Sequence, residues 1–115
     1  MMAGLLFARA GVETLVLEKH GDFLRDFRGD TVHPSTIELF DELGLADAML
    51  KRPHDKVTAI SARIGGKSFP VADLTHLPVR HRFMMVMPQW DFLDFVRDEA
   101  ERYRAFSLRL NAEAV

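Results

Sequence analysis

The sequence predicts an α/β fold on three observations. A helical pattern runs into a glycine and a short buried strand near the N-terminus, a glycine pair separates two strand-like runs in the middle, and an amphipathic helix precedes a strand near the end. Apolar residues make up 48% of the 115 residues and charged residues 28%, which is an ordinary globular composition. The chain is therefore expected to fold around an apolar core.

The first predicted unit is a helix followed by a strand. Small and apolar side chains recur at helical spacing over residues 2–10, and Gly11 follows as a residue that ends helices by taking a positive φ. Residues 14–17 then suit a buried strand, which closes on the carboxylate of Glu18. This is the second half of a βαβ unit, and its first strand is missing from the sequence.

The middle of the chain predicts a helix and then strands. Ser35 and Glu38 have the spacing of a capping box at the start of a helix that Gly44 ends, and a further helical turn is expected over residues 46–51. The Gly-Gly pair at residues 65–66 separates two strand-like runs and predicts a β-hairpin.

The last third of the chain predicts strand, helix and strand. The run "RHRFMMVMP" is typical of a strand, and Pro88 opens an amphipathic helix that reaches about Tyr103. The run "FSLRL" then begins another strand.

Composition argues against several classes of protein. A formal net charge of -2 gives no electrostatic reason to expect nucleic acid or an anionic membrane as a partner. The absence of cysteine excludes disulfides and thiolate metal sites, and the five histidines lack metal-ligand spacing, so no metal site is predicted. No apolar run approaches the ~20 residues of a membrane span. We therefore expect a soluble, cytoplasmic protein.

Three stretches carry a resemblance to a known family: "LLFARAGVETLVLEKH", "DFRGDTVHPSTIELFDELGL" and "MPQWDFLDFVRDEA". In this order they resemble the N-terminal part of FAD-dependent aromatic hydroxylases, the flavin monooxygenases of the para-hydroxybenzoate hydroxylase type. The resemblance implies an incomplete Rossmann-like FAD-binding domain with a β-hairpin portion from the substrate-domain sheet. It assigns residues 1–53 to a partial FAD-binding domain, 54–87 to a β-rich segment of the substrate half, and 88–115 to the FAD-binding domain again.

The resemblance also implies which residues bind the cofactor. Glu18 matches the acidic residue that binds the ribose hydroxyls of FAD, because a carboxylate accepts hydrogen bonds from both hydroxyls, and Lys19 follows it beside the adenine. Arg28 matches an arginine near the flavin and its diphosphate, where its guanidinium fork binds phosphate or stacks on a ring. Gln89 matches a glutamine that contacts the FAD linker at a helix N-terminus.

The sequence departs from the family in one important respect. The motif GxGxxG should stand about 20 residues before the acidic residue, which places it at or before Met1, and it does not occur in the chain. We expect the chain to be part of a longer FAD-dependent monooxygenase that hydroxylates a small aromatic substrate with NADH or NADPH and O2. The chain alone is expected to be inactive, and no catalytic acid or base can be named in it.

Two other interpretations of the sequence remain open. The chain can belong to another class of FAD- or NAD-dependent oxidoreductase, or it can be a truncated product without cofactor that serves at most as an interaction or folding module. In either case the strand that ends at Glu18 lacks its neighbour on one side. Such an open edge favours association with a second copy of the chain.

Overall fold

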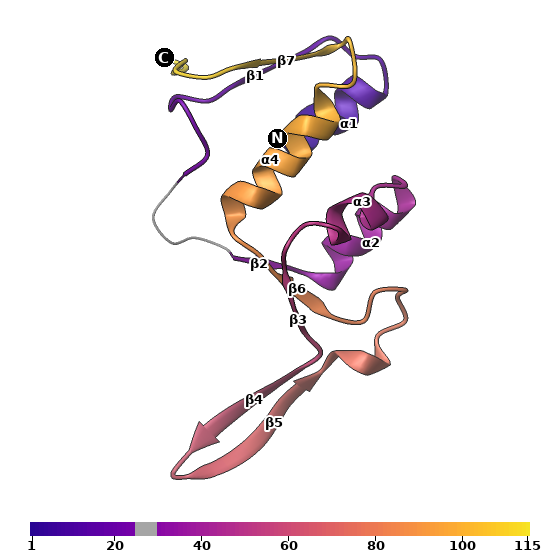
Figure 1. Cartoon of the computed structure of the whole chain (residues 1–115), viewed down its shortest axis with the longest axis vertical. Coiled ribbons are helices and arrows are strands. Elements are labelled where there is room, and N and C mark those ends of the chain that lie inside the picture. Colours follow the sequence, from indigo (N-terminus) through magenta and orange to yellow (C-terminus); the bar gives the residue numbers. More distant parts are fainter. Residues whose placement is uncertain (25–29) are drawn as a thin grey trace. The chain divides into compact units, whose positions relative to one another are not determined.

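The computed structural model describes residues 1–24 and 30–115 (Figure 1). Its elements along the chain are α1 (Met2–Arg9), β1 (Thr14–Leu17), β2 (Thr31–Val32), α2 (Pro34–Glu42), α3 (Ala46–Leu50), β3 (Asp55–Val57), β4 (Ala59–Ile64), β5 (Lys67–Asp73), the 3-10 helix η1 (Leu74–His76), β6 (Met84–Val86), α4 (Gln89–Ala100) and β7 (Phe106–Arg109). They form two compact units. The first holds the described residues of Met1–Arg28 and Gln89–Val115, and the second those of Gly29–Pro88. The predicted α/β class is confirmed.

The first unit is built on a parallel pair of strands. β1 and β7 lie in register, from Thr14 opposite Phe106 to Leu17 opposite Arg109. α1 packs on these strands through Gly4, because a Cβ added there would lie 2.7 Å from Val16 Cγ2. Figure 1 shows α1 and α4 side by side, and residues of the two helices are in contact.

The core of the first unit uses another face of α1 than the one that the sequence pattern indicated, since Leu5 and Ala8 are buried while Leu6 and Phe7 are exposed. The buried apolar side chains come from α1, the loop after β1, α4 and the start of β7, and they are Leu5, Ala8, Phe23, Phe95, Val96, Ala100 and Phe106. Gly11 follows α1 with a φ of 79°, so the predicted glycine stop of this helix is confirmed. Alternate residues of β1 point away from this core and leave Leu15 and Leu17 exposed.

The second unit contains a small antiparallel sheet and two helices. β6 lies between β2 and β3, with Met85 of β6 opposite both Val32 and Lys56. Buried side chains of the sheet, α2 and α3 are Val32, Ile37, Phe40, Ala46, Met49 and Met85. The sequence did not predict β2, because two residues are too few to show a strand pattern.

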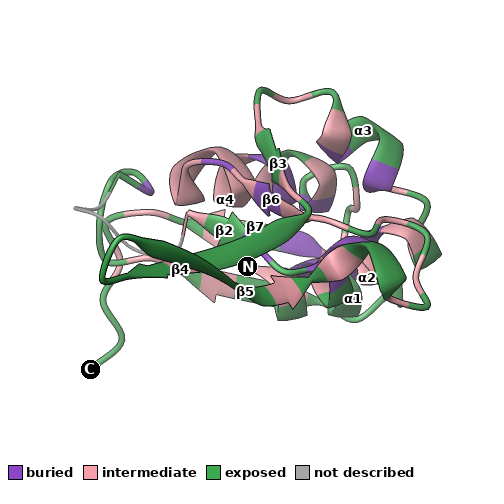
Figure 2. Cartoon of the chain, turned by 90° about the horizontal axis from the view of Figure 1, so that it is seen from below, coloured by how far each residue is buried: buried purple, intermediate pink, exposed green. Residues whose placement is uncertain are grey.

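The second unit also carries a long β-hairpin. β4 and β5 pair around Gly65 and Gly66, whose φ values of 56° and 78° are those a tight two-residue turn requires. This confirms the hairpin predicted from the glycine pair. Figure 2 shows both strands mostly in the colour of exposed residues. The preceding strand run is divided at Thr58, since β3 joins the sheet of β6 while β4 joins only β5.

The start of α2 differs from the predicted capping box. The cap is His33, whose Nδ1 accepts a hydrogen bond from the Ser35 N–H at 3.3 Å, and Pro34 is the first helical residue. Ser35 is therefore inside the helix, and the capping-box prediction was wrong. Glu38 instead accepts a hydrogen bond from the backbone N–H of Arg80 at 3.3 Å. Proline favours the first turn because its fixed φ is helical and the N–H it lacks has no helical partner there.

Candidate functional site

Glu18 follows the last residue of β1, at the carboxyl end of the parallel pair. Its backbone N–H donates to the carbonyl of Arg109 at 2.9 Å, which extends the pairing of β1 with β7 by one residue. Its side-chain Oε1 accepts a hydrogen bond from the His20 N–H at 2.9 Å. The backbone and the carboxylate of Glu18 are therefore both held in place.

A shallow open hollow lies beside Glu18. Its lining comes from the residues that follow β1 and β7, together with the end of β1, and comprises Leu17, Glu18, Lys19, His20, Ala112, Glu113 and Ala114. The carboxyl ends of neighbouring parallel strands are where α/β sheets bind ligands. The hollow offers two carboxylates and one ammonium group to a polar ligand.

The structure locates three of the four predicted site residues. Glu18 and Lys19 both line the hollow. Gln89 is the first residue of α4 and is half-buried, but it does not line the hollow. Arg28 lies outside the described residues. The roles assigned to all four residues stay predictions.

Sequence reasoning did not find the contribution of residues 112–114. These residues reach the hollow because β7 is parallel to β1 and in register with it. No local sequence pattern indicates that register, since the two strands are separated by most of the chain. Glu113 in particular has no motif around it.

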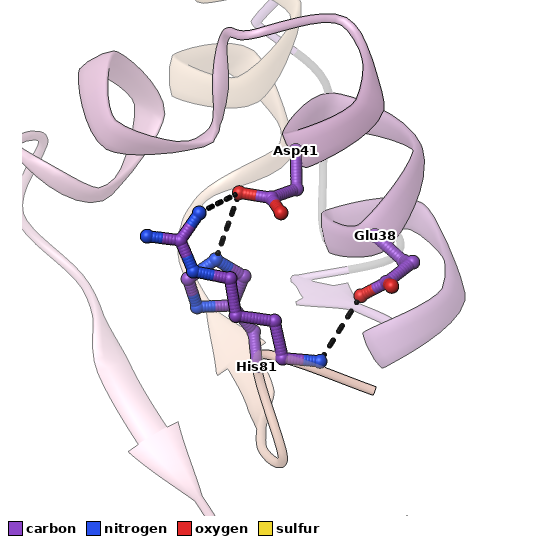
Figure 3. Close-up of polar contacts among 4 residues, drawn as sticks. Glu38, Asp41 and His81 are labelled. Atoms are coloured by element: carbon purple, nitrogen blue, oxygen red, sulfur yellow. Dashed lines mark hydrogen bonds and ion pairs between the residues drawn. The ribbon is translucent and has the colours of Figure 1, made fainter. Parts of the chain in front are cut away.

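A second polar cluster lies within the second unit and is drawn in Figure 3. The Oδ1 atom of Asp41 lies 2.8 Å from Arg80 Nη1 and 3.4 Å from His81 Nε2. His81 is only 13% exposed at its side chain, while Arg80 is exposed. These contacts join α2 to the segment before β6. We therefore assign the cluster a structural role.

Two further findings concern the described part of the chain alone. Within residues 1–24 and 30–115, no three side chains of the histidine, aspartate and glutamate types gather closely enough to hold a metal ion. Over the same residues, no helix combines the length and apolar character needed to cross a membrane.

The parallel pairing of β1 with β7, the close packing of α1 on these strands through Gly4, and the carboxylate at the end of β1 are features found in dinucleotide-binding α/β proteins. The family of the FAD binding domain matches residues 1–115. The chain therefore belongs to this family of FAD binding domains. Comparison with curated proteins gave no significant match.

Solved structures give the same fold. The p-nitrophenol 4-monooxygenase PnpA from Pseudomonas putida DLL-E4 aligns with a TM-score of 0.82 at 22% sequence identity, over 96% of this chain and 28% of its own. PqsL from Pseudomonas aeruginosa, a probable FAD-dependent monooxygenase, aligns with a TM-score of 0.80 at 18% identity, over 99% of this chain and 31% of its own. The chain thus spans less than a third of the length of these proteins.

FAD is the cofactor that the family implies, and the residues present fit one end of it. Glu18 can accept from the ribose hydroxyls, and the hollow beside it is lined by polar side chains and two alanines, a mixture that suits the polar ribose and the apolar face of a base. The diphosphate needs backbone amides of a Gly-rich turn, and no GxGxxG occurs in residues 1–115. The fit therefore covers the adenosine end of FAD.

Proposed function

We propose that the chain is the adenosine-binding part of an FAD-dependent monooxygenase. The observation that carries this proposal is the Glu18 carboxylate at the carboxyl end of β1, beside an open hollow, in a chain of the FAD binding domain family. Two solved proteins with this fold support the proposal, since both are described as monooxygenases. A small aromatic substrate, NAD(P)H as co-substrate and a cytoplasmic location complete the proposal.

Each proposed contact has a physical reason. Glu18 accepts hydrogen bonds from two vicinal hydroxyls, and Lys19 lies beside the base. Arg28 binds the diphosphate or stacks on a ring, and Gln89 contacts the linker at the N-terminus of α4. The chemistry that FAD supplies when bound is electron transfer from the nicotinamide and reaction with dioxygen. The protein groups hold the cofactor in place.

The proposal is tested by titrating the chain with FAD to about 1 mM and following the backbone amide resonances. We expect the amides of Glu18, Lys19 and Ala112–Ala114 to shift. Glu18→Ala should weaken binding by about 1 to 3 kcal/mol, the range for hydrogen bonds to a charged group. Glu13→Ala is the matched control, since Glu13 is exposed at the other end of β1.

Two results would contradict this proposal. Equal FAD affinity of Glu18→Ala and the original chain would remove Glu18 from the site. Shifts centred on the hairpin of β4 and β5 would place the ligand elsewhere.

A further inference from the structure

The chain after β7 crosses over the loop that follows β1. The Ala112 N–H donates to the carbonyl of Glu18 at 2.9 Å, and the Asn111 N–H donates to the carbonyl of His20 at 3.0 Å. The Glu18 N–H in turn donates to the carbonyl of Arg109 at 2.9 Å. Three backbone hydrogen bonds therefore fasten the residues around Glu18 to the end of β7.

Asn111 makes this crossing with an unusual backbone. Its φ is 53°, and in the described part of the chain it is the one residue other than glycine with a positive φ. Asparagine tolerates this left-handed region better than most residues, and β-branched residues are strongly disfavoured there. In this conformation the N–H groups of residues 111 and 112 both donate to carbonyl groups of the loop after β1.

Gly21 makes room for the Asn111 side chain. A Cβ added to Gly21 would lie 3.3 Å from Asn111 Oδ1 and 3.4 Å from its Nδ2, closer than most real Cβ contacts. The amide side chain therefore lies directly over the Gly21 backbone. Asn111 thus contacts the loop after β1 through both its backbone and its side chain.

The same loop orients the carboxylate of Glu18. The His20 carbonyl accepts from Asn111, and the His20 N–H donates to Glu18 Oε1 at 2.9 Å. Holding His20 by its carbonyl limits the directions in which its N–H can point. We propose that Asn111, through its left-handed backbone, is a positioning residue that sets the Glu18 carboxylate at the hollow for the ribose of FAD, an inference that rests on the proposed function.

The variants test the backbone conformation of Asn111 and its side chain separately. Asn111→Val removes the tolerance for positive φ, whereas Asn111→Gly keeps the backbone conformation and loses the side chain. Asn111→Ala also loses the side chain but disfavours positive φ, so it compares directly with Asn111→Gly. Ser107→Val is the control, because Ser107 is exposed on β7 and a β-branched residue suits a strand.

The first readout is the pH dependence of the His20 amide resonance. Its N–H donates to the Glu18 carboxylate, so the resonance should move in the acid range in which that carboxylate is protonated, and Glu18→Gln should abolish this acid movement. We expect the movement to persist in Ser107→Val and Asn111→Gly, to be reduced in Asn111→Ala and to be lost in Asn111→Val. Circular dichroism checks that each variant is folded. If Asn111→Val unfolds, the comparison of Asn111→Ala with Asn111→Gly decides the question.

The second readout is the FAD dissociation constant. Asn111→Val should raise it about five- to tenfold, less than the loss of one whole hydrogen bond to a charged group, because the Glu18 carboxylate itself is retained. Asn111→Gly and Ser107→Val should change it less than about twofold. If the original chain does not bind FAD, the proposed function fails, while the His20 resonance still tests Asn111. A His20 resonance that follows Glu18 unchanged in Asn111→Val and Asn111→Ala would overturn the inference.

Discussion

Asp73, the last residue of β5, caps the 3-10 helix η1 with its carboxylate. Oδ1 accepts from the Thr75 hydroxyl at 2.6 Å and from the Thr75 N–H at 2.9 Å. These two hydrogen bonds, the hydroxyl first, hold the pKa of Asp73 below its ordinary value of 3.8. A carboxyl whose folded pKa is lowered stabilises the fold above its unfolded pKa, and this contribution is lost as the pH falls through the folded pKa.

We therefore predict that the amide resonance of Thr75 titrates below pH 3.8. Thr75→Val removes the hydroxyl, which is the larger cause, and should move that titration upward towards the ordinary value. Asp73→Asn should abolish it, because no carboxylate remains. A titration unchanged by Thr75→Val would show that the hydroxyl does not stabilise the charged form.

Individual residues differ in how far the sequence identifies them. Glu18 could be selected because a carboxylate at the end of an apolar strand is a local pattern. Asn111 could not, because its role depends on a crossing between segments that only the register of β1 and β7 brings together. The cap of α2 was misassigned because His33 is an uncommon cap, while Ser35 and Glu38 fit the common pattern by chance.

At the scale of elements, the packing of α1 depends on Gly4. A Cβ at this position would lie 2.7 Å from Val16 Cγ2 and 3.0 Å from Phe106 Cε2. Replacing a helical glycine by alanine gains about 1 kcal/mol of helix propensity. Overpacking a close-packed core costs about 1 to 3 kcal/mol. The clash should therefore outweigh the gain in helix propensity.

We predict that Gly4→Ala lowers the free energy of unfolding by up to about 2 kcal/mol, measured by urea denaturation. Adding Val16→Ala removes the nearest contact, so Gly4→Ala should cost less in that background than in the original chain. A more stable Gly4→Ala chain would show that α1 shifts away from the strands without penalty.

Elements with local signals could be predicted, and those that depend on distant partners could not. Gly11, Gly44 and the pair at residues 65–66 all have positive φ and end helices or turn a hairpin, as their sequence contexts indicated. By contrast, the strand run before the hairpin contains no mark at Thr58 to divide it. That division depends on β3 pairing with β6 rather than with β5. The Asp41 contacts with Arg80 and His81 also join residues about forty positions apart and carry no sequence signal.

At the scale of the whole molecule, β1 provides an open edge at which the described chain can pair with another chain. The Thr14 N–H donates to Ala105 and the Glu18 N–H to Arg109, so alternate N–H groups of β1 face β7. The N–H groups of Leu15 and Leu17 then face the opposite edge, where no strand pairs with β1 in the described residues. An edge of unpaired backbone groups with exposed leucines is a template for another strand.

We therefore propose that the 115-residue chain associates with a second copy through the open edge of β1, and we predict that sedimentation velocity will show a concentration-dependent dimer. Leu15→Lys places a charge on this edge strand and should raise the dimer dissociation constant at least about tenfold, or 1.4 kcal/mol. Phe69→Lys is the matched control on β5, since Phe69 is 48% exposed and Leu15 is 52% exposed. It should leave the dissociation constant within about twofold.

A chain that stays monomeric at all concentrations would refute the association. A dimer dispersed by Phe69→Lys and retained in Leu15→Lys would assign the interface to the hairpin, whose apolar side chains are also exposed.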